Sequence, residues 1–348
     1  MAVREGFQVT TLDVFADVDT RAVAQAAHLL KLRGDAIDEE AFKSQLVGLN
    51  PSRFDAVLYG SIFDAAPDCL RWLERQAPVR GNCADTLIAI QDKPAFFRLL
   101  QQLEIPFPQT VYRAGSVSAD AEWLIKRPQA SGGAHVRIWH GEALDAHEYL
   151  QQKMQGLPVS LLFCANDKAV RKIGFNRLLT RDCIEYPFQY AGAVSRFPMP
   201  NHAVNILLDA AQKLTNYYRL EGINSLDAIL MNDGVMVLEL NPRLSASANL
   251  YSTMPLIRMQ LGLQTDDFFL RDFGDQLSCS EMIVFADKDI VILEKVSFPE
   301  WVADIPVAGQ TIPKHNPVCS VQAQAATHEA AYGLLIERFD QLKTSLEL

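Results

Sequence analysis

Residues 226–247 read LDAILMNDGVMVLELNPRLSAS, and the fold can be worked out from this stretch. Two apolar runs flank an Asn-Asp-Gly turn at residues 232–234, which predicts a β-hairpin. Asp227 interrupts the first run and Glu239 the second. Pairing about the turn sets these two residues roughly opposite each other, and Asn241 shares the face of Glu239 because side chains alternate along a strand.

Two carboxylates and an amide oxygen on one face form a hard, oxygen-only group of ligands, which suits Mg²⁺ shared with phosphate. Like charges so close repel each other unless a cation lies between them. We therefore predict that Asp227, Glu239 and Asn241 hold a metal ion. The alternative is a solvated hairpin face, which the flanking Leu238 and Leu240 disfavour.

A lysine and a glycine-rich loop lie about a hundred residues earlier. Lys126 occupies the apolar run WLIKRP, where burial is costly unless the lysine meets an anion. The loop ASGGAH at residues 130–135 follows, and Gly132 and Gly133 allow backbone N–H groups to converge on a phosphate. The pattern predicts a hairpin with a phosphate-binding tip. A plain hairpin with an edge lysine is the alternative.

Composition excludes several classes of function. The 348 residues suit two or three domains, and the net charge of −10 argues against nucleic-acid binding while allowing a local cationic pocket. The sequence has no apolar run near the roughly 18 residues of a membrane span, and its six cysteines show no CxxC spacing. We expect a cytoplasmic protein without membrane or nucleic-acid partners. The P-loop, GxGxxG and HExxH signatures are also missing from the sequence.

The N-terminal region predicts alternating strands and helices. Residues 7–15 and 54–62 are β-rich, whereas residues 21–33 and 67–76 have helical patterns, which together indicate a small parallel sheet flanked by helices. The first six residues end in glycine, as helices often do. We expect the chain to begin inside a helix whose preceding strand is absent.

The rest of the chain alternates in the same way. A helix is predicted at residues 92–103, and the two prolines of the IPFP segment at residues 105–108 stop it. Residues 159–164 and 169–174 predict a strand pair, and residues 204–220 an amphipathic helix.

Taken together, these features resemble the ATP-grasp superfamily of carboxylate–amine ligases over about residues 86–250. In that family a lysine opens a helix that ends at an IPxP segment, which Lys93 and residues 105–108 match. A strand lysine precedes a glycine-rich loop, as Lys126 does here. The family's E-x-N-x-R metal motif matches Glu239 and the residues that follow it, Asn241 and Arg243.

The resemblance implies an α/β (α+β) fold of the ATP-grasp type. It implies a Rossmann-like pre-ATP-grasp domain at residues 1–88 that lacks its first strand. An ATP-grasp small subdomain would follow at residues 89–158. The large subdomain, with a C-terminal extension, would occupy residues 159–348.

The resemblance also implies roles for individual residues. ATP would bind with Mg²⁺ or Mn²⁺, and a substrate carboxylate would attack its γ-phosphate to give an acyl phosphate, which an amine converts to an amide. Lys126 and Arg243 are the implied catalytic residues. The alternative for Arg243 is a structural ion pair with a neighbouring acid. The implied nucleotide-binding residues are Lys93, Lys126, Ser131, Gly132, Gly133, Gln152, Lys153, Met154 and Leu238, with the adenine hinge at residues 151–156.

Some positions depart from the family pattern. Gln152 replaces a common hinge glutamate, and Pro158 or a residue close to it replaces the acid that would hold the ribose. Ser225 stands where D-alanine ligases have an arginine, which disfavours that activity. The tail from Phe298 resembles family members near the tyramine–glutamate ligase branch, which suggests one-carbon cofactor synthesis. The candidate residues for the acceptor pocket are Arg171, Lys172, Arg177, Ser245 and Ser247.

The expected partners are a small-molecule carboxylate and an amine, with a homodimer also compatible with the resemblance. Two other functions are open at this stage. One is a non-catalytic ATP-binding regulator on the same fold. The other is an ATP-dependent carboxylase.

Overall fold

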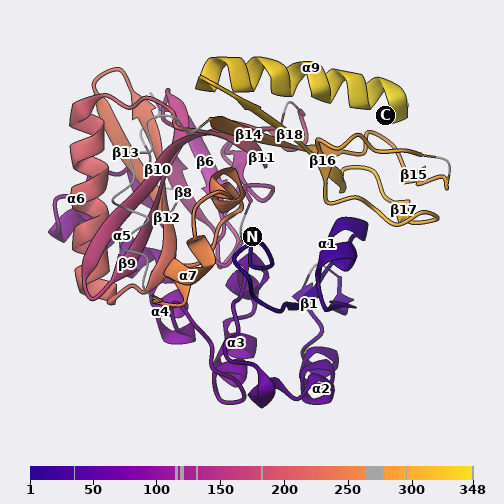
Figure 1. The fold of residues 1–348 in the computed structure, drawn as a ribbon. Coiled ribbons are helices and arrows are strands. Elements are labelled where there is room, and N and C mark those ends of the chain that lie inside the picture. Colours follow the sequence, from indigo (N-terminus) through magenta and orange to yellow (C-terminus); the bar gives the residue numbers. More distant parts are fainter. Residues whose placement is uncertain are drawn as a thin grey trace.

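An eight-stranded antiparallel sheet forms the body of the molecule in the computed structural model (Figure 1). The strand order is β13-β12-β9-β10-β11-β14-β18-β16. The bounds are β9 Leu157–Asn166, β10 Ala169–Thr180, β11 Tyr190–Ser195, β12 Gly222–Met231, β13 Gly234–Asn241, β14 Ser278–Phe285, β16 Val302–Ala303 and β18 Pro317–Ala325. The structure describes residues 1–34, 36–113, 117, 121–130, 132–181, 183–263, 277–294 and 296–346.

Two long helices cover this sheet, as Figure 1 shows. Helix α6 (Asn201–Tyr218) buries Leu207 and Leu214, which are seven residues apart and share one helical face, against β9. Helix α9 (His328–Leu346) buries Leu335 in a second cluster with Val284 of β14. The predicted helix at residues 204–220 and the predicted strand pair at 159–174 are confirmed.

A smaller antiparallel sheet has the strand order β5-β8-β6-β7. Its strands are β5 Thr110–Val111, β6 Trp123–Lys126, β7 Arg137–Ile138 and β8 Tyr149–Gln152. Helices α4 (Ala84–Gln91) and α5 (Lys93–Gln102) precede it, and Asp92 caps α5 by accepting from the amide of Ala95. The predicted hairpin with a glycine-rich tip is confirmed as β6–β7.

The N-terminal region contains a parallel pair of strands, β1 (Thr10–Asp13) and β2 (Ala26–Leu29), and a short hairpin. The other elements are β3 Leu32–Arg33, β4 Ala36–Ile37, α1 Val18–Val23, α2 Glu39–Leu49, α3 Pro67–Glu74, and the 3₁₀ helices Pro51–Arg53 and Ser61–Ala65. The helix predicted at 67–76 is confirmed as α3.

Three N-terminal predictions are wrong. The helix predicted at residues 21–33 does not extend that far, because α1 ends at Val23. The chain then forms β2, since pairing with β1 overrides the local helical pattern. The strand predicted at residues 54–62 is reduced to one bridge, Val57 to Val79, and ends in a 3₁₀ helix. Residues 1–6 form a hydrogen-bonded turn and no α-helix.

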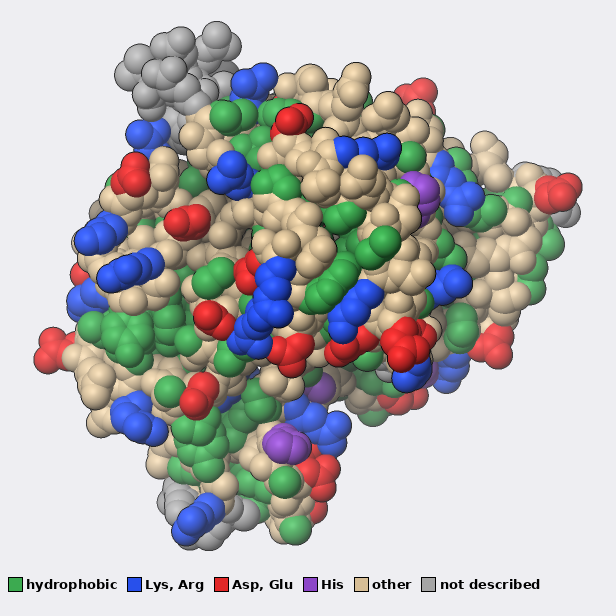
Figure 2. Space-filling view, turned by 90° about the horizontal axis from the view of Figure 1, so that it is seen from below, with side chains coloured by type: hydrophobic (Ala, Val, Ile, Leu, Met, Phe, Trp, Pro, Cys, Tyr) green, Lys and Arg blue, Asp and Glu red, His purple; other side chains and the backbone are tan. Residues whose placement is uncertain are grey.

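The C-terminal part adds a hairpin of β15 (Ile290–Val291) and β17 (Thr311–Ile312). The 3₁₀ helix η4 (Ala246–Tyr251) and helix α7 (Leu256–Gln260) follow β13. Figure 2 shows Lys and Arg side chains mixed with Asp and Glu on the face seen from below, with no large patch of one charge. Among the described residues, every helix is too short or too polar to cross a membrane.

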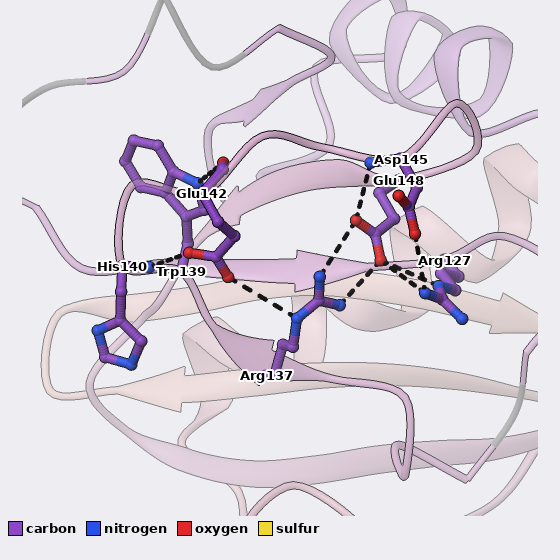
Figure 3. A network of polar contacts seen from close by, with 7 residues as sticks. All are labelled: Arg127, Arg137, Trp139, His140, Glu142, Asp145 and Glu148. Atoms are coloured by element: carbon purple, nitrogen blue, oxygen red, sulfur yellow. Dashed lines mark hydrogen bonds and ion pairs between the residues drawn. The ribbon is translucent and has the colours of Figure 1, made fainter.

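A buried carboxylate closes the base of the glycine-rich loop (Figure 3). Glu148, 5% exposed, accepts a hydrogen bond from Arg127 Nε at 3.0 Å, just before the loop, and from Arg137 Nη1 at 2.8 Å, just after it. The hydrogen bonds from Arg137 are the main cause that lowers the pKa of Glu148 to about 2. Glu148 thus holds the two strand ends that carry the loop.

Glu148→Gln should lower stability by about 1–3 kcal/mol at pH 7, because a charged hydrogen-bonded group is lost. A carboxylate with a depressed folded pKa stabilises above its unfolded pKa and loses that effect as pH falls. The difference in melting temperature between this variant and wild type should therefore shrink as the pH falls below about 5 and approaches 2, the pKa of Glu148 in the folded protein. Thermal unfolding of wild type and variant at pH 7 and pH 3 measures this difference in melting temperature. Glu142→Gln, at an exposed position near the same arginine, is the control, and equal effects of the two variants would contradict this account.

Candidate active site

A cavity of about 590 Å³ lies between the smaller sheet, the hairpin of β12 and β13, and the N-terminal region. Every described residue that the sequence assigned to ATP, metal or catalysis lines it, namely Lys93, Lys126, Gly132, Gly133, Gln152, Lys153, Met154, Asp227, Leu238, Glu239, Asn241 and Arg243. Ser131, also assigned to ATP, lies outside the described residues.

The two predicted metal acids face each other across the hairpin. Asp227 of β12 pairs directly with Glu239 of β13, and a bulge follows Asp227. Asn241 Nδ2 donates to Asp227 Oδ2 at 3.0 Å, so the three side chains lie on one face, as the alternation predicted. Burial, followed by the charge of Glu239, raises the pKa of Asp227 well above its ordinary value.

Two lysines supply positive charge beside these carboxylates. Lys93, the first residue of α5, is buried, and Lys126 Nζ donates to Gln151 Oε1 at 2.7 Å. Burial lowers the pKa of Lys126 to about 8. Burial alone would raise the pKa of Glu239, but the charges of Lys93 and Lys126 bring it below its ordinary value.

The carboxylate pair fits a magnesium ion that shares its coordination with a nucleotide. No cluster of three or more His, Cys, Asp or Glu side chains able to hold a metal is present among the described residues. Mg²⁺ typically keeps several waters and uses one or two protein carboxylates plus substrate phosphates, so Asp227 and Glu239 suffice. Burial and then the charge of Glu239 raise the pKa of Asp227, and a cation would relieve the repulsion between the two acids. Asn241 would have to turn its amide to offer oxygen, because its Oδ1 accepts from Arg243 at 3.3 Å.

An acid from the N-terminal region holds Arg243, a contact that the sequence did not predict. Asp64 Oδ2 accepts from Arg243 Nε at 2.9 Å and from Nη2 at 2.6 Å, and both side chains are largely buried. The structural pairing considered for Arg243 therefore exists, and its partner is 179 positions away. Nη1 makes one long contact, 3.5 Å to the Leu244 carbonyl. The pair fixes the plane of the guanidinium at the cavity wall.

Asn82 reinforces the same junction. Its Nδ2 donates to the Pro242 carbonyl at 3.0 Å, and its Oδ1 accepts from the backbone amide of Glu221 at 2.9 Å. Tyr59 Oη donates to the Asn82 carbonyl at 2.6 Å. Residues near the ends of β12 and β13 are thus tied to the N-terminal region.

The glycine-rich loop packs against the segment before β11. Gly132 and Gly133 have φ of +71° and +74°, a region that favours glycine. Tyr190 N donates to the Gly132 carbonyl at 2.8 Å. A Cβ on Gly133 would lie 2.1 Å from the Phe188 carbonyl oxygen, whereas a Cβ on Gly132 would meet no atom within 4 Å.

The predicted adenine hinge begins in β8 and continues past it. The backbone N–H of Gln152 donates a hydrogen bond to the backbone carbonyl of Gln109 at 2.9 Å. Lys153 Nζ is 3.0 Å from Glu122 Oε2, so this ammonium is engaged in an ion pair outside the phosphate end of the site. Met154 and Leu238 add apolar surface to the cavity wall.

The acceptor-pocket prediction is partly wrong. Ser245 and Ser247 line the cavity with hydroxyls 3.0 Å apart. Arg171, Lys172 and Arg177 of β10 do not line it, and the Arg177 guanidinium instead lies 4.9 Å from the ring centre of Tyr332 in α9. The pattern at residues 169–174 predicts a strand, but it does not show which side chains point toward the cavity.

Two more residues in the cavity wall were not among the predicted site residues. Gln91 Nε2 donates to the Asp64 carbonyl at 2.6 Å, and its buried Oε1 has no hydrogen-bond partner. His135 has a buried Nδ1, also without a partner. Both depend on contacts between distant segments.

Gly133→Ala should displace the loop and weaken ATP binding about tenfold or more, because the added Cβ collides with backbone. Gly132→Ala is a matched control, since it carries the same positive-φ strain, about 1–2 kcal/mol, without the collision. Calorimetric titration with ATP measures the ATP affinity of the two variants and of wild type. Equal losses in both variants would contradict the packing of the loop on Phe188.

Comparisons with known proteins identify the fold. A model of the ATP-grasp domain matches residues 90–247, and no curated protein matches the chain. Biotin carboxylase from Campylobacter jejuni superposes with a TM-score of 0.72 at 13% identity, over 96% of this chain and 86% of that one. N5-carboxyaminoimidazole ribonucleotide synthetase from Thermotoga maritima superposes with a TM-score of 0.66 at 16% identity, over 97% of this chain and 93% of that one.

L-amino acid ligase from Bacillus licheniformis has a TM-score of 0.69 at 12% identity, over 97% of this chain and 92% of that one. At these low identities, the superpositions show a shared fold. Residues 90–247 match the ATP-grasp domain, and the chain has the ATP-grasp fold.

Proposed function

We propose that this protein is an ATP-dependent ligase that joins a carboxylate to an amine through an acyl phosphate, releasing ADP and phosphate. One observation carries the proposal: Asp227 and Glu239 face each other in a cavity also lined by Lys93, Lys126 and Arg243. Paired acids suit a metal, and the three cations suit a polyphosphate whose charge changes during transfer. The solved ligase and synthetase with this fold support the proposal.

The phosphates would lie between the two lysines and the glycine-rich loop. Lys93 begins α5, so the helix N-terminus adds its partial positive charge to that of the ammonium. Lys126 makes a hydrogen bond to Gln151, which fixes its position. Asp227, Glu239 and a turned Asn241 would hold Mg²⁺ or Mn²⁺, which supplies positive charge to the β- and γ-phosphate oxygens.

The reaction would take two steps. A carboxylate oxygen of the acid attacks the γ-phosphorus, and the bond from that phosphorus to the bridging oxygen breaks, so that ADP leaves. The amine nitrogen then attacks the acyl carbon, inorganic phosphate leaves and the amine loses a proton. Arg243, oriented by Asp64, would bind the transferring phosphoryl group or the acyl phosphate through its remaining N–H groups.

Nucleotide recognition differs from the common family pattern. The acids of the described cavity lining are Asp64, Asp227 and Glu239, and all three are assigned above to Arg243 or the metal. Pro158 and Gln152 line the hinge side. We infer that an amide and backbone groups, in place of a carboxylate, contact the adenosine.

We assign a set of polar side chains in the cavity wall to the acceptor end. They are Ser61, Gln91, Ser245 and Ser247, together with Asp64. Hydroxyls and an amide suit a short polar acid and an amine. The resemblance of the C-terminal tail to the tyramine–glutamate ligase branch makes glutamate with an aromatic amine the first pair to test, in keeping with one-carbon cofactor synthesis. A homodimer is also our expectation, which light scattering would measure.

Phosphate release from Mg·ATP should require both an acid and an amine, and the product mass should equal their sum minus water. A panel of amino acids and amines, assayed singly and in pairs, tests this. Glu239→Ala and Lys126→Ala should each lower turnover at least about a hundredfold, since each removes charge stabilisation from the transferring phosphoryl group. Lys172→Ala, on β10 outside the cavity, is the matched lysine control and should leave turnover unchanged.

The same assay separates the other two functions. Phosphate release that needs bicarbonate and no amine would indicate a carboxylase. ATP binding without phosphate release for any pair would indicate a regulator. Full turnover in both Glu239→Ala and Lys126→Ala would refute the site assignment.

A further inference from the structure

His135 follows the glycine-rich loop and lines the cavity, yet its ring is not needed for the loop's own packing. The loop is fixed through the Gly132 carbonyl, the close approach of Gly133 to Phe188, and the hydrogen bond from Val136 N to the Gly133 carbonyl at 3.1 Å. The imidazole contributes to none of these contacts. Its place in the cavity therefore calls for another explanation.

One ring nitrogen of His135 is buried without a partner. Nδ1 has no hydrogen bond, although a buried polar atom normally finds one. A neutral imidazole carries one N–H and one lone pair, and an orphaned lone pair is tolerated better than an orphaned N–H. With the proton on Nε2, the orphaned group is a lone pair at Nδ1, and Nε2–H is the donor of the ring.

The charges around His135 identify the end of the cavity that it faces. Glu239, Lys126, Arg127 and Lys93 act electrostatically on the ring. Arg127 is bound to Glu148, and the other three belong to the metal and phosphate end. The apolar residues Met154 and Leu238 line the adenine side. A hydrogen-bond donor among two ammonium groups and a metal-binding acid matches a phosphate oxygen.

We propose that His135 is a phosphate-binding residue, whose Nε2–H donates a hydrogen bond to the β-phosphate of bound ATP. This inference rests on the proposed ATP site and adds to it a contact from the second half of the hairpin. Lys126 would hold the phosphates from the strand before the loop and His135 from the residues after it. The loop is then anchored on the nucleotide at both ends.

The test is calorimetric titration of the full chain with ADP and with AMP in the presence of Mg²⁺. His135→Leu should weaken ADP binding about tenfold to a hundredfold, the range for a lost hydrogen bond to a charged group, and leave AMP binding unchanged. His135→Gln should bind ADP nearly as wild type, because a glutamine amide nitrogen reaches the place of Nε2. His135→Asn, whose amide reaches only the place of Nδ1, should behave as the leucine variant does.

His140→Leu is the matched control, because His140 lies on the same hairpin, exposed and with its ring turned away from the polar network in Figure 3. Wild-type ADP affinity in His135→Leu, or retention by Asn but not by Gln, would overturn the inference and leave the proposed function standing. Wild-type protein that binds no adenine nucleotide would refute the proposed function itself. If the leucine variant does not fold, the comparison of Gln with Asn decides.

Discussion

The site depends on the mutual repulsion of two carboxylates that the hairpin holds opposite each other. The register of β12 and β13 places Asp227 against Glu239, and removal from bulk water makes their repulsion stronger. A fold that keeps such a pair needs positive charge close by. Lys93 and Lys126 supply part of it. Burial and the charge of Glu239 raise the pKa of Asp227, and a cation bound between the two acids would favour its ionised form.

The surrounding elements place each charge from a different part of the chain. Helix α5 brings Lys93, the smaller sheet brings Lys126, and the N-terminal region brings Asp64, which orients Arg243. Glu148 closes the base of the loop that carries the phosphate-binding groups. The cavity is thus assembled by all three regions, although the carboxylate pair itself lies on a single hairpin.

Local signals explain what could be predicted from sequence. The turn at residues 232–234 predicts the hairpin and brings Asp227 and Glu239 close together. Their direct pairing also needs the bulge after Asp227, which shifts the register by one residue and which the sequence did not predict. Asp64 could not be found this way, because its pairing with Arg243 spans 179 positions. The helix expected at 21–33 failed for a similar reason, since β2 exists only by pairing with β1. The domain bounds at residues 88 and 158 stay predictions.

Manganese binding followed by electron paramagnetic resonance tests the central claim most directly, since it reads the metal without requiring a known substrate. Titrations of Mn²⁺ with and without ADP would be compared for wild type and Asp227→Asn. Wild type should bind Mn²⁺ in an ADP-dependent manner, and the variant should bind it at least about tenfold more weakly, because one of two charged ligands is gone. Equal affinity of the two proteins for Mn²⁺ would contradict the claim that this carboxylate pair holds the metal.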